Sequence, residues 1–336
     1  MKNVTKILTA VVLCAALFAS DQRISALGGN AALWPGDEAN IAAFPGSLND
    51  HALVQFSGIG WDIDATGAAT NDDDESATVL FDKDGTTWGF SYDNAGVNWF
   101  NMMWGNGDMG LTMQMVSSDD DAGTEASGFG LGWGQTMDFG DVGVNYASYE
   151  VGGVDLSTIA VNWRGDLGFW VFDSMTAGFQ MADVGDDSAT MLNATAFTHM
   201  DAGGADVLFA LGVRNVSAED WDADNNGTID TNTAGNQAAT DVGYMHLETT
   251  VAVEANMTDW ATFRVGAKYS YQLSGDNDWT GPGATETGKG WDLKTGLGFN
   301  WGGFSADYTI AQSFFNDPVS HITGYDDSNL TDQTVT

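Results

Sequence analysis

Charged side chains of both signs share one face of neighbouring stretches of the chain. Acidic and basic groups that line a water-filled passage give it an electric field that orients polar solutes and sets ion preference. The alternative is that such groups neutralise one another inside a filled barrel. The candidate lumen residues are His246, Glu248, Glu254, Arg264, Lys268, Asp292 and Lys294.

The turn between the first two of these stretches decides which groups meet. Pairing of Glu254 with Thr262 would place Glu248 opposite Lys268. Glu254 would then lie diagonal to Arg264, a separation that two long side chains can bridge. We therefore expect ion pairs along one wall of a lumen.

A second candidate site is a calcium loop at residues 222–230. Its oxygen-bearing residues, with Gly227 sixth and Ile229 eighth, follow the order of an EF-hand loop, but Thr233 stands where that loop has its bidentate glutamate. The alternative is an ordinary solvated acidic loop. The candidate ligands are Asp222, Asp224, Asn226, the carbonyl of Thr228 and Asp230.

Catalytic spacing is not found in the chain. The four histidines show no metal spacing, and no serine nucleophile stands in an elbow motif beside a histidine and an acid. We therefore expect no enzymatic activity and no required cofactor.

Alternating side chains predict the strands that would position the charged groups. In residues 291–301 the apolar face begins and ends with tryptophan, and the other face carries Asp292 and Lys294. Ten residues of tilted strand span about 25 Å along a barrel axis, which is the height of the lipid-facing band of an outer-membrane barrel. The predicted aromatic belt includes Trp260, Tyr269, Tyr271, Trp291 and Trp301.

The same alternation recurs along residues 50–315. It predicts an all-β fold, a single transmembrane antiparallel up-and-down barrel of about 14 strands, with 12 to 16 open. Short turns on one side, including one at residues 83–85, would oppose longer acidic loops. A turn is also expected at 164–166. The glycine row at 128–134 predicts close approach of something inside, such as the amino-terminal segment.

Residues 1–20 have the features of a signal peptide. Lys2 and Lys6 precede an apolar run at 7–18 that is too short to span a bilayer as a helix. The single cysteine, Cys14, lies inside this segment, so disulfides and thiolate metal sites are excluded from the mature chain. We expect a further division into an amino-terminal segment and candidate plug at 21–49, the barrel, and an acidic tail or last strand at 316–336.

The net charge of −37 indicates which partners suit the protein. Such acidity argues against nucleic acid and anionic surfaces. The expected partners are outer-membrane lipid and small solutes, with a homo-oligomer left open.

Residues 26–48 resemble the amino-terminal signature of the long-chain fatty-acid transporter barrels. They read ALGGNAAL at 26–33, an acidic-Ala stretch at 37–41, and FPGSL at 44–48, where the family has an Asn-Pro-Ala-x-Leu turn and this chain has Phe44 in place of Asn. The resemblance covers about 25 residues. It implies a segment that plugs the lumen or packs under the first strands.

These features predict a porin-like channel in the bacterial outer membrane for passive diffusion of small polar solutes, with cation preference. Two alternatives remain open. One is a transporter of hydrophobic ligands of the fatty-acid type, which requires an apolar pocket inside the barrel and a lateral opening. The other is a structural or adhesive surface barrel.

Overall fold

The computed structural model describes residues 21–57, 62–63, 69–70, 76–93, 99–119, 125–151, 153–185, 187–221, 240–275, 289–302 and 304–310. Fifteen strands form one antiparallel sheet in which each strand pairs with the next along the chain, apart from β2 and β3. This confirms the predicted all-β, up-and-down fold, with 15 strands in the described sheet where about 14 were expected.

The strands of the large sheet have the following bounds: β1 Leu53–Ser57, β4 Ser76–Lys83, β5 Thr86–Asp93, β6 Trp99–Gly105, β7 Met109–Asp119, β8 Glu125–Met137, β9 Gly140–Val151, β10 Val154–Phe169, β11 Phe172–Val184, β12 Asp187–Asp201, β13 Ala205–Trp221, β14 Thr240–Thr258, β15 Ala261–Gly275, β16 Lys289–Trp301 and β17 Phe304–Ile310. The separate β2 (Asp62–Ile63) and β3 (Ala69–Thr70) pair with each other.

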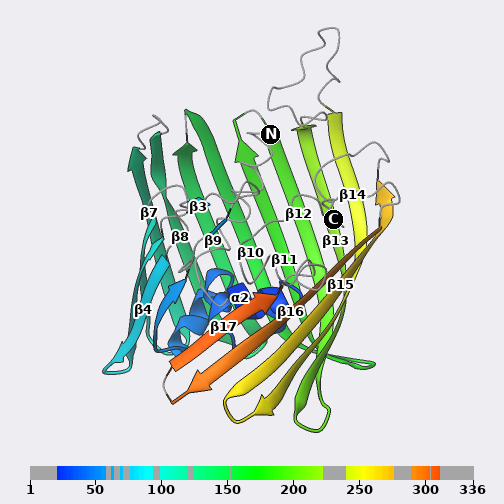
Figure 1. Cartoon of the computed structure of the whole chain (residues 1–336). Coiled ribbons are helices and arrows are strands. Elements are labelled where there is room, and N and C mark those ends of the chain that lie inside the picture. The colour runs from blue at the N-terminus through cyan, green and yellow to red at the C-terminus, as the bar shows by residue number, and fades with distance from the viewer. Residues whose placement is uncertain are drawn as a thin grey trace.

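Short hairpin turns join alternate strands at one end of the sheet, which we call the turn end (Figure 1). In the turn between β4 and β5, Asp84 and Gly85 both have positive φ, as an Asp-Gly hairpin turn requires. The connections at the other end run wholly or partly through residues outside the described ranges, so the prediction of longer acidic loops there stays a prediction.

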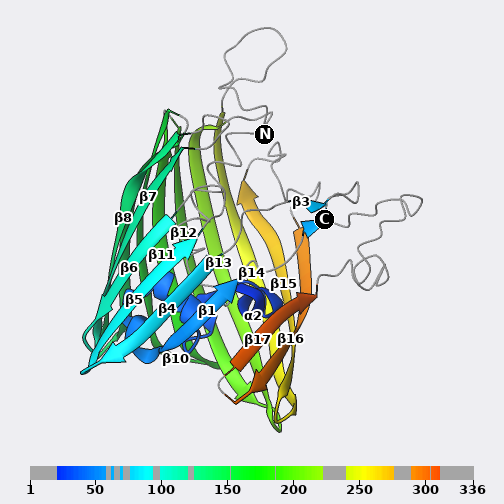
Figure 2. The same ribbon diagram turned by 60° about the vertical axis from the view of Figure 1, so that its left-hand side comes forward.

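The sheet curves around an interior but does not close among the described residues. β1 and β17 are its two edge strands, and no described pairing joins them (Figure 2). The predicted tail or last strand at 316–336 lies outside the described residues.

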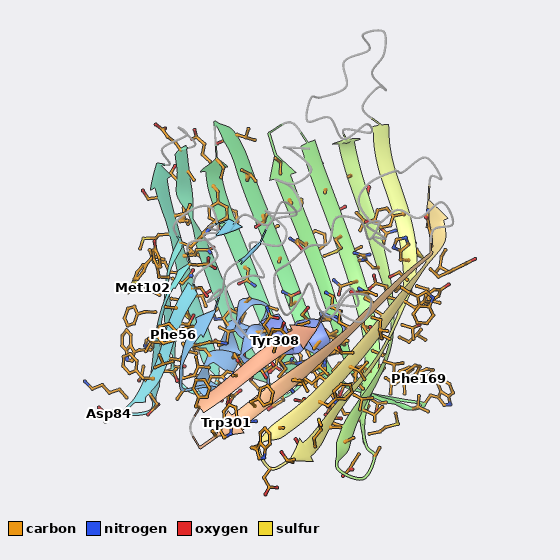
Figure 3. The ribbon with its side chains drawn as sticks, viewed as in Figure 1. Phe56, Asp84, Met102, Phe169, Trp301 and Tyr308 are labelled. Atoms are coloured by element: carbon orange, nitrogen blue, oxygen red, sulfur yellow. The ribbon has the colours of Figure 1, made fainter. Side chains whose placement is uncertain are left out.

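The two faces of the sheet differ in polarity. The outer face exposes large apolar side chains on almost every strand, and Figure 3 shows Phe56, Met102 and Phe169 pointing away from the interior. Threonine, asparagine, glutamine and arginine are buried on the inner face. The period-2 pattern therefore separates an apolar outside from a polar inside, the reverse of a soluble sheet protein.

Residues 21–50 cross the interior near the turn end (Figure 1). We call residues 21–50 the inner segment. It contains α2 (Asp21–Ala26) and the 3-10 helices η1 (Ala31–Leu33), η2 (Glu38–Ala42) and η3 (Pro45–Asp50). α2 contacts β15 to β17 and η3 contacts β5 to β9, so the segment bridges opposite walls. No helix among the described residues is long and apolar enough to cross a membrane.

Apolar side chains of the inner segment pack into the wall at both ends. Leu27, Leu33 and Trp34 form one cluster with inward residues of β12 to β14, among them Phe197 and Leu208. Ile41 and Leu48 form another cluster with Leu80 and Met103. Burying these side chains stabilises the segment in place, at about 1.5–3 kcal/mol for each large aliphatic group.

One sequence prediction in the middle of the chain is wrong. Residues 164–166 lie within β10 and not in a turn, because β10 continues to Phe169 and the chain reverses at Trp170, a non-glycine residue with φ 56°. The alternation is weak along most of β11. Its inward side includes the small or polar residues Ser174, Thr176, Gly178 and Ala182, which give little contrast with the outer side.

Candidate functional site

Six of the ten basic residues in the chain gather on the interior side of the sheet. Five come from strands and one from the inner segment: Arg23, Arg164, Arg214, Arg264, Lys268 and Lys294. Arg23 and Arg164 link the inner segment to the wall, and Arg264 pairs with Glu254, the carboxylate that binds Arg23. The other three basic residues, Arg214, Lys268 and Lys294, lie on β13, β15 and β16.

Arg23 of α2 ties the inner segment to the wall. Its guanidinium pairs with Asp37 in the inner segment and with Glu254 on β14, to which Nε donates at 3.2 Å. Burial by itself would lower the pKa of Arg23, but the hydrogen bonds and charges of Glu254 and Asp37 outweigh it and raise that pKa. Arg23 therefore remains a cation.

Arg264 completes this chain of charges on the wall. Its Nε donates to Glu254 Oε1 at 2.9 Å, and its Nη1 pairs with Asp307 on β17. Glu254 thus accepts from Arg23 and from Arg264. This arrangement orders the inner segment and three strands in one network.

The predicted register of β14 and β15 is wrong by two residues. Glu254 lies directly opposite Arg264, and Lys268 lies opposite Thr250. β14 continues to Thr258 and β15 begins at Ala261, so only two residues form the turn. The register shifts between Asn256 and Thr258. Glu248 still reaches Lys268, now along the diagonal.

Arg164 on β10 is a second anchor for the inner segment. It is 6% exposed and pairs with Asp141 on β9 at 2.8 Å. Nη1 also donates to Asn40 Oδ1 at 2.8 Å, and the guanidinium lies over the ring of Phe44. One side chain therefore contacts the wall, the η2 helix and the residue before η3.

His199 on β12 holds the middle of the inner segment. Nε2 lies 2.7 Å from the carbonyl oxygen of Leu33, and Nδ1 lies 3.0 Å from Asp206. Its ring meets that of Trp34 edge-on, with centroids 4.8 Å apart. Leu33 and Trp34 are therefore fixed through the backbone and through a side chain.

Glycines on the inner face allow the backbone of the inner segment to touch the wall. A Cβ at Gly134 would lie 2.6 Å from the amide nitrogen of Gly46, and one at Gly110 or Gly143 would overlap a carbonyl oxygen of the inner segment. In the glycine row at 128–134, the two glycines nearer the turn end, Gly132 and Gly134, therefore lie against the inner segment. Gly128 instead lies against the backbone and the ring at Ser148 and Tyr149 of the wall, and Gly130 lies against the side chains of Gln114 and Tyr149.

A second charged group lies farther from the turn end, on β13 to β15. Arg214 Nε and Glu248 Oε1 are 3.0 Å apart, and Lys268 Nζ is 3.2 Å from Glu248 Oε2. His246 lies opposite Arg214 and packs against the ring of Tyr244. We call Arg214, Glu248 and Lys268 the basic triad.

The remaining predicted lumen residues lie beside these groups. Lys294 Nζ is 3.7 Å from Asp292 and 3.3 Å from Ser25 Oγ in α2. Sequence reasoning missed Arg23, Arg164, Arg214 and His199. Arg214 could have been found from its place in the alternation of β13, but Arg23 and Arg164 pair with residues up to 231 positions away.

The aromatic residues expected to form a belt lie on the outer face at the two ends of β15 and β16. Trp260, Trp301 and Phe299 stack near the turn end. Tyr269 packs against Trp291, whose side chain is well exposed, at the far end of β16. Tyr271 is also exposed on this face.

An open pocket of about 500 Å³ separates the inner segment from β12, β13 and β15 to β17. Arg23, Asp37 and Glu38 line it on one side, and Asp206 and Asp307 line it on the other. This pocket lies directly beside the ion-pair network of Arg23, Asp37, Arg264 and Asp307.

Protonation of Glu38 should make the stability of the protein depend on pH. Burial raises the pKa of Glu38, and the negative charge of Asp37 raises it further. The folded state therefore binds this proton more tightly, and the resulting stabilisation, complete below the unfolded value of 4.5, is lost as pH rises through the raised folded pKa. Because Glu38→Gln stays neutral, its melting temperature should increasingly exceed that of the wild type as pH rises. A constant difference across the pH series would contradict this.

Among the described residues, no group of three or more His, Asp or Glu side chains is arranged to hold a metal ion. The candidate calcium loop at 222–230 lies outside the described residues and stays a prediction.

No protein-family model matches the chain, and no curated protein matches it. One solved structure that matches is a bacterial polysaccharide outer membrane secretin, with TM-score 0.49 and 12% identity. The match covers 70% of this chain and 81% of that one.

Proposed function

We propose that this protein is a bacterial outer-membrane channel through which small polar solutes diffuse passively, with a preference for cations. The barrel wall would lie in lipid, and the inner segment would narrow the lumen at the turn end. The observation that carries the proposal is the polarity of the sheet, apolar outside and charged inside.

The outer face supports a membrane location. Phe, Trp, Leu, Val and Met side chains are exposed on it from β1 to β17, an area far larger than the apolar patches of soluble proteins. Aromatic side chains gather near the turn end and again near Trp291. Lipid contact would bury this surface.

The inner charges support a selective passage. The basic triad and the Asp292–Lys294 pair remain partly exposed, so they can act on a passing ion. The net charge of −37 would concentrate cations at the mouths of the lumen. Cation preference would then come mainly from the mouths, and the charges of the wall would adjust this preference and orient the solute.

Single-channel recording tests the proposal. The chain from residue 21 onward would be refolded into a planar bilayer, with a salt gradient to give the reversal potential. Stepwise conductance with a cation-selective reversal potential is expected. A folded protein without conductance would contradict the channel function.

Neutralising Glu248 should weaken cation preference. Glu248→Gln leaves Arg214 and Lys268 without their shared carboxylate, so the cation-to-anion permeability ratio should fall about two- to fivefold at low salt. Reversal potentials measure the ratio. Asp84→Asn is the matched control, because Asp84 lies in an exposed turn and Asn tolerates its positive φ. Equal shifts in both variants would argue against a role for Glu248.

A transporter of hydrophobic ligands is the second candidate function. The observation in its favour is an apolar cluster on the inner face of β6 to β11. A water-filled lumen would be lined by polar residues there, whereas an apolar ligand would bind to apolar ones. The buried members of the cluster are Trp99, Val116, Ala126, Ala147, Tyr149, Leu156 and Val184. Saturable binding of a fatty acid by a folded protein that lacks conductance would favour this function.

A further inference from the structure

The basic triad differs from the other charged groups of the interior in its balance of charge. Two cations, Arg214 and Lys268, share one carboxylate, Glu248. The arginines that hold the inner segment are each matched by two anionic or carbonyl partners. The triad therefore carries net positive charge inside a strongly acidic protein.

The triad also lies where a solute would meet it. The next inward residue of β14 toward the turn end is Thr250, and a Cβ added to Gly28 would come within 2.8 Å of its methyl group. The inner segment thus forms a floor beside the triad. The side chains of Arg214 and Lys268 are each 32% exposed, while Glu248 is 16% exposed.

Polar atoms of the basic triad and of the neighbouring His246 lack hydrogen-bond partners among the described residues. Arg214 Nε and Glu248 Oε1 are close enough for an ion pair, but their geometry is not that of a hydrogen bond. Nδ1 of His246, directly opposite Arg214, is buried without a hydrogen-bond partner among the described residues. A guanidinium has five donors in a fork that suits a planar carboxylate.

An acceptor for a positive group lies one strand away. Asp292 on β16 is directly opposite Lys268 and is more than half exposed, with Lys294 at 3.7 Å. A carboxylate at the triad and an ammonium near Asp292 would therefore both meet opposite charges.

We propose that the basic triad is a carboxylate-binding subsite for small zwitterionic solutes, an inference that rests on the proposed channel function. The acidic mouths repel a simple anion, whereas a zwitterion has no net charge and reaches the floor of the lumen. Arg214 and Lys268 bind its carboxylate, and Asp292 faces its ammonium group.

Ligand-observed saturation-transfer NMR tests the subsite without requiring conduction. The probes are glycine, acetate and methylammonium, added separately to the chain from residue 21 onward, refolded in detergent. Glycine is expected to give saturation transfer with the wild type. The double variant Arg214→Gln/Lys268→Gln should bind glycine about tenfold more weakly or worse, because charge-assisted hydrogen bonds are lost. Methylammonium should be unaffected by it.

Matched variants separate recognition from folding. Lys83→Gln removes an exposed basic residue at the end of β4 and should leave glycine binding unchanged. Arg214→Lys/Lys268→Arg keeps both charges and should retain most of the binding, with far-ultraviolet circular dichroism confirming the fold. Equal glycine signals in the wild type and the double Gln variant would overturn the subsite, as would a conducting wild type that gives no glycine signal. Glycine binding without conductance would overturn the channel and leave the subsite standing.

Discussion

Replacing Arg164 by methionine should lower the free energy of unfolding by about 3 kcal/mol, because it breaks a nearly buried charged network. Methionine keeps much of the side-chain volume but makes none of the polar contacts. Asp141 then loses its cation, and Asn40 Oδ1 loses the donor at 2.8 Å. Asp141 is 27% exposed, so water compensates for part of the loss.

Urea-induced unfolding in detergent, followed by tryptophan fluorescence, measures the effect of Arg164→Met. Lys83→Met is the matched control, since a surface change of this kind shifts stability by no more than about 0.5 kcal/mol. Arg164→Lys should fall between the two, because lysine keeps the charge but not the fork of donors. Equal stability of Arg164→Met and the wild type would show that Arg164 does not anchor the inner segment.

Replacing Gly143 by valine should displace the inner segment from the wall. A Cβ at Gly143 would overlap the carbonyl oxygen of Ala43 and lie 3.2 Å from the Cα of Phe44. Both neighbours are backbone atoms, so relief requires movement of the segment itself. Overpacking of this kind costs typically about 1–3 kcal/mol, and rigid backbone on both sides places this case at the upper end.

A reporter cysteine at Ser47 would detect the displacement. Ser47 is buried in the inner segment, and the chain from residue 21 onward contains no other cysteine. Its reaction with a water-soluble maleimide should be slow in the wild-type background and about tenfold or more faster with Gly143→Val. The control is Gly290→Val, since a Cβ there meets no atom within 4 Å. Equal rates in all three proteins would mean that the wall does not hold the segment at Gly143.

Much of the wall followed from local sequence, because period-2 alternation depends only on which face a side chain occupies. That rule placed His246, Glu248, Lys268 and Lys294 on the inner face from their positions alone. The Asp84-Gly85 turn was also predictable from local sequence, because its positive φ values favour those two residue types.

Register and long-range pairing could not be predicted in this way. The irregularity near Asn256 shifted the partner of Glu254 by two residues, a difference that alternation cannot detect because both registers keep the same face inward. The reversal at Trp170 places a bulky residue in a conformation that sequence rules reserve for Gly, Asn and Asp.

The ion-pair network depends on the tertiary fold. Arg23 meets Glu254 across 231 residues, and Arg164 meets Asn40 across 124. The resemblance of residues 26–48 to the transporter barrels implied a segment inside or under the sheet. The contacts that hold this segment follow only from the arrangement of the strands around it.

We propose that one face of the sheet lies in lipid and that the other lines water. Leu293 and Lys294 test it most directly, because they are neighbours on β16 with similar exposure, 44% for the outward Leu293 and 37% for Lys294. Each would be replaced by cysteine in the chain from residue 21 onward, and the protein would be reconstituted in lipid vesicles. We expect a charged, water-soluble thiol reagent to modify Lys294→Cys at least about tenfold faster than Leu293→Cys, with the difference lost in urea. Equal rates in intact vesicles, or faster reaction at Leu293→Cys, would contradict it.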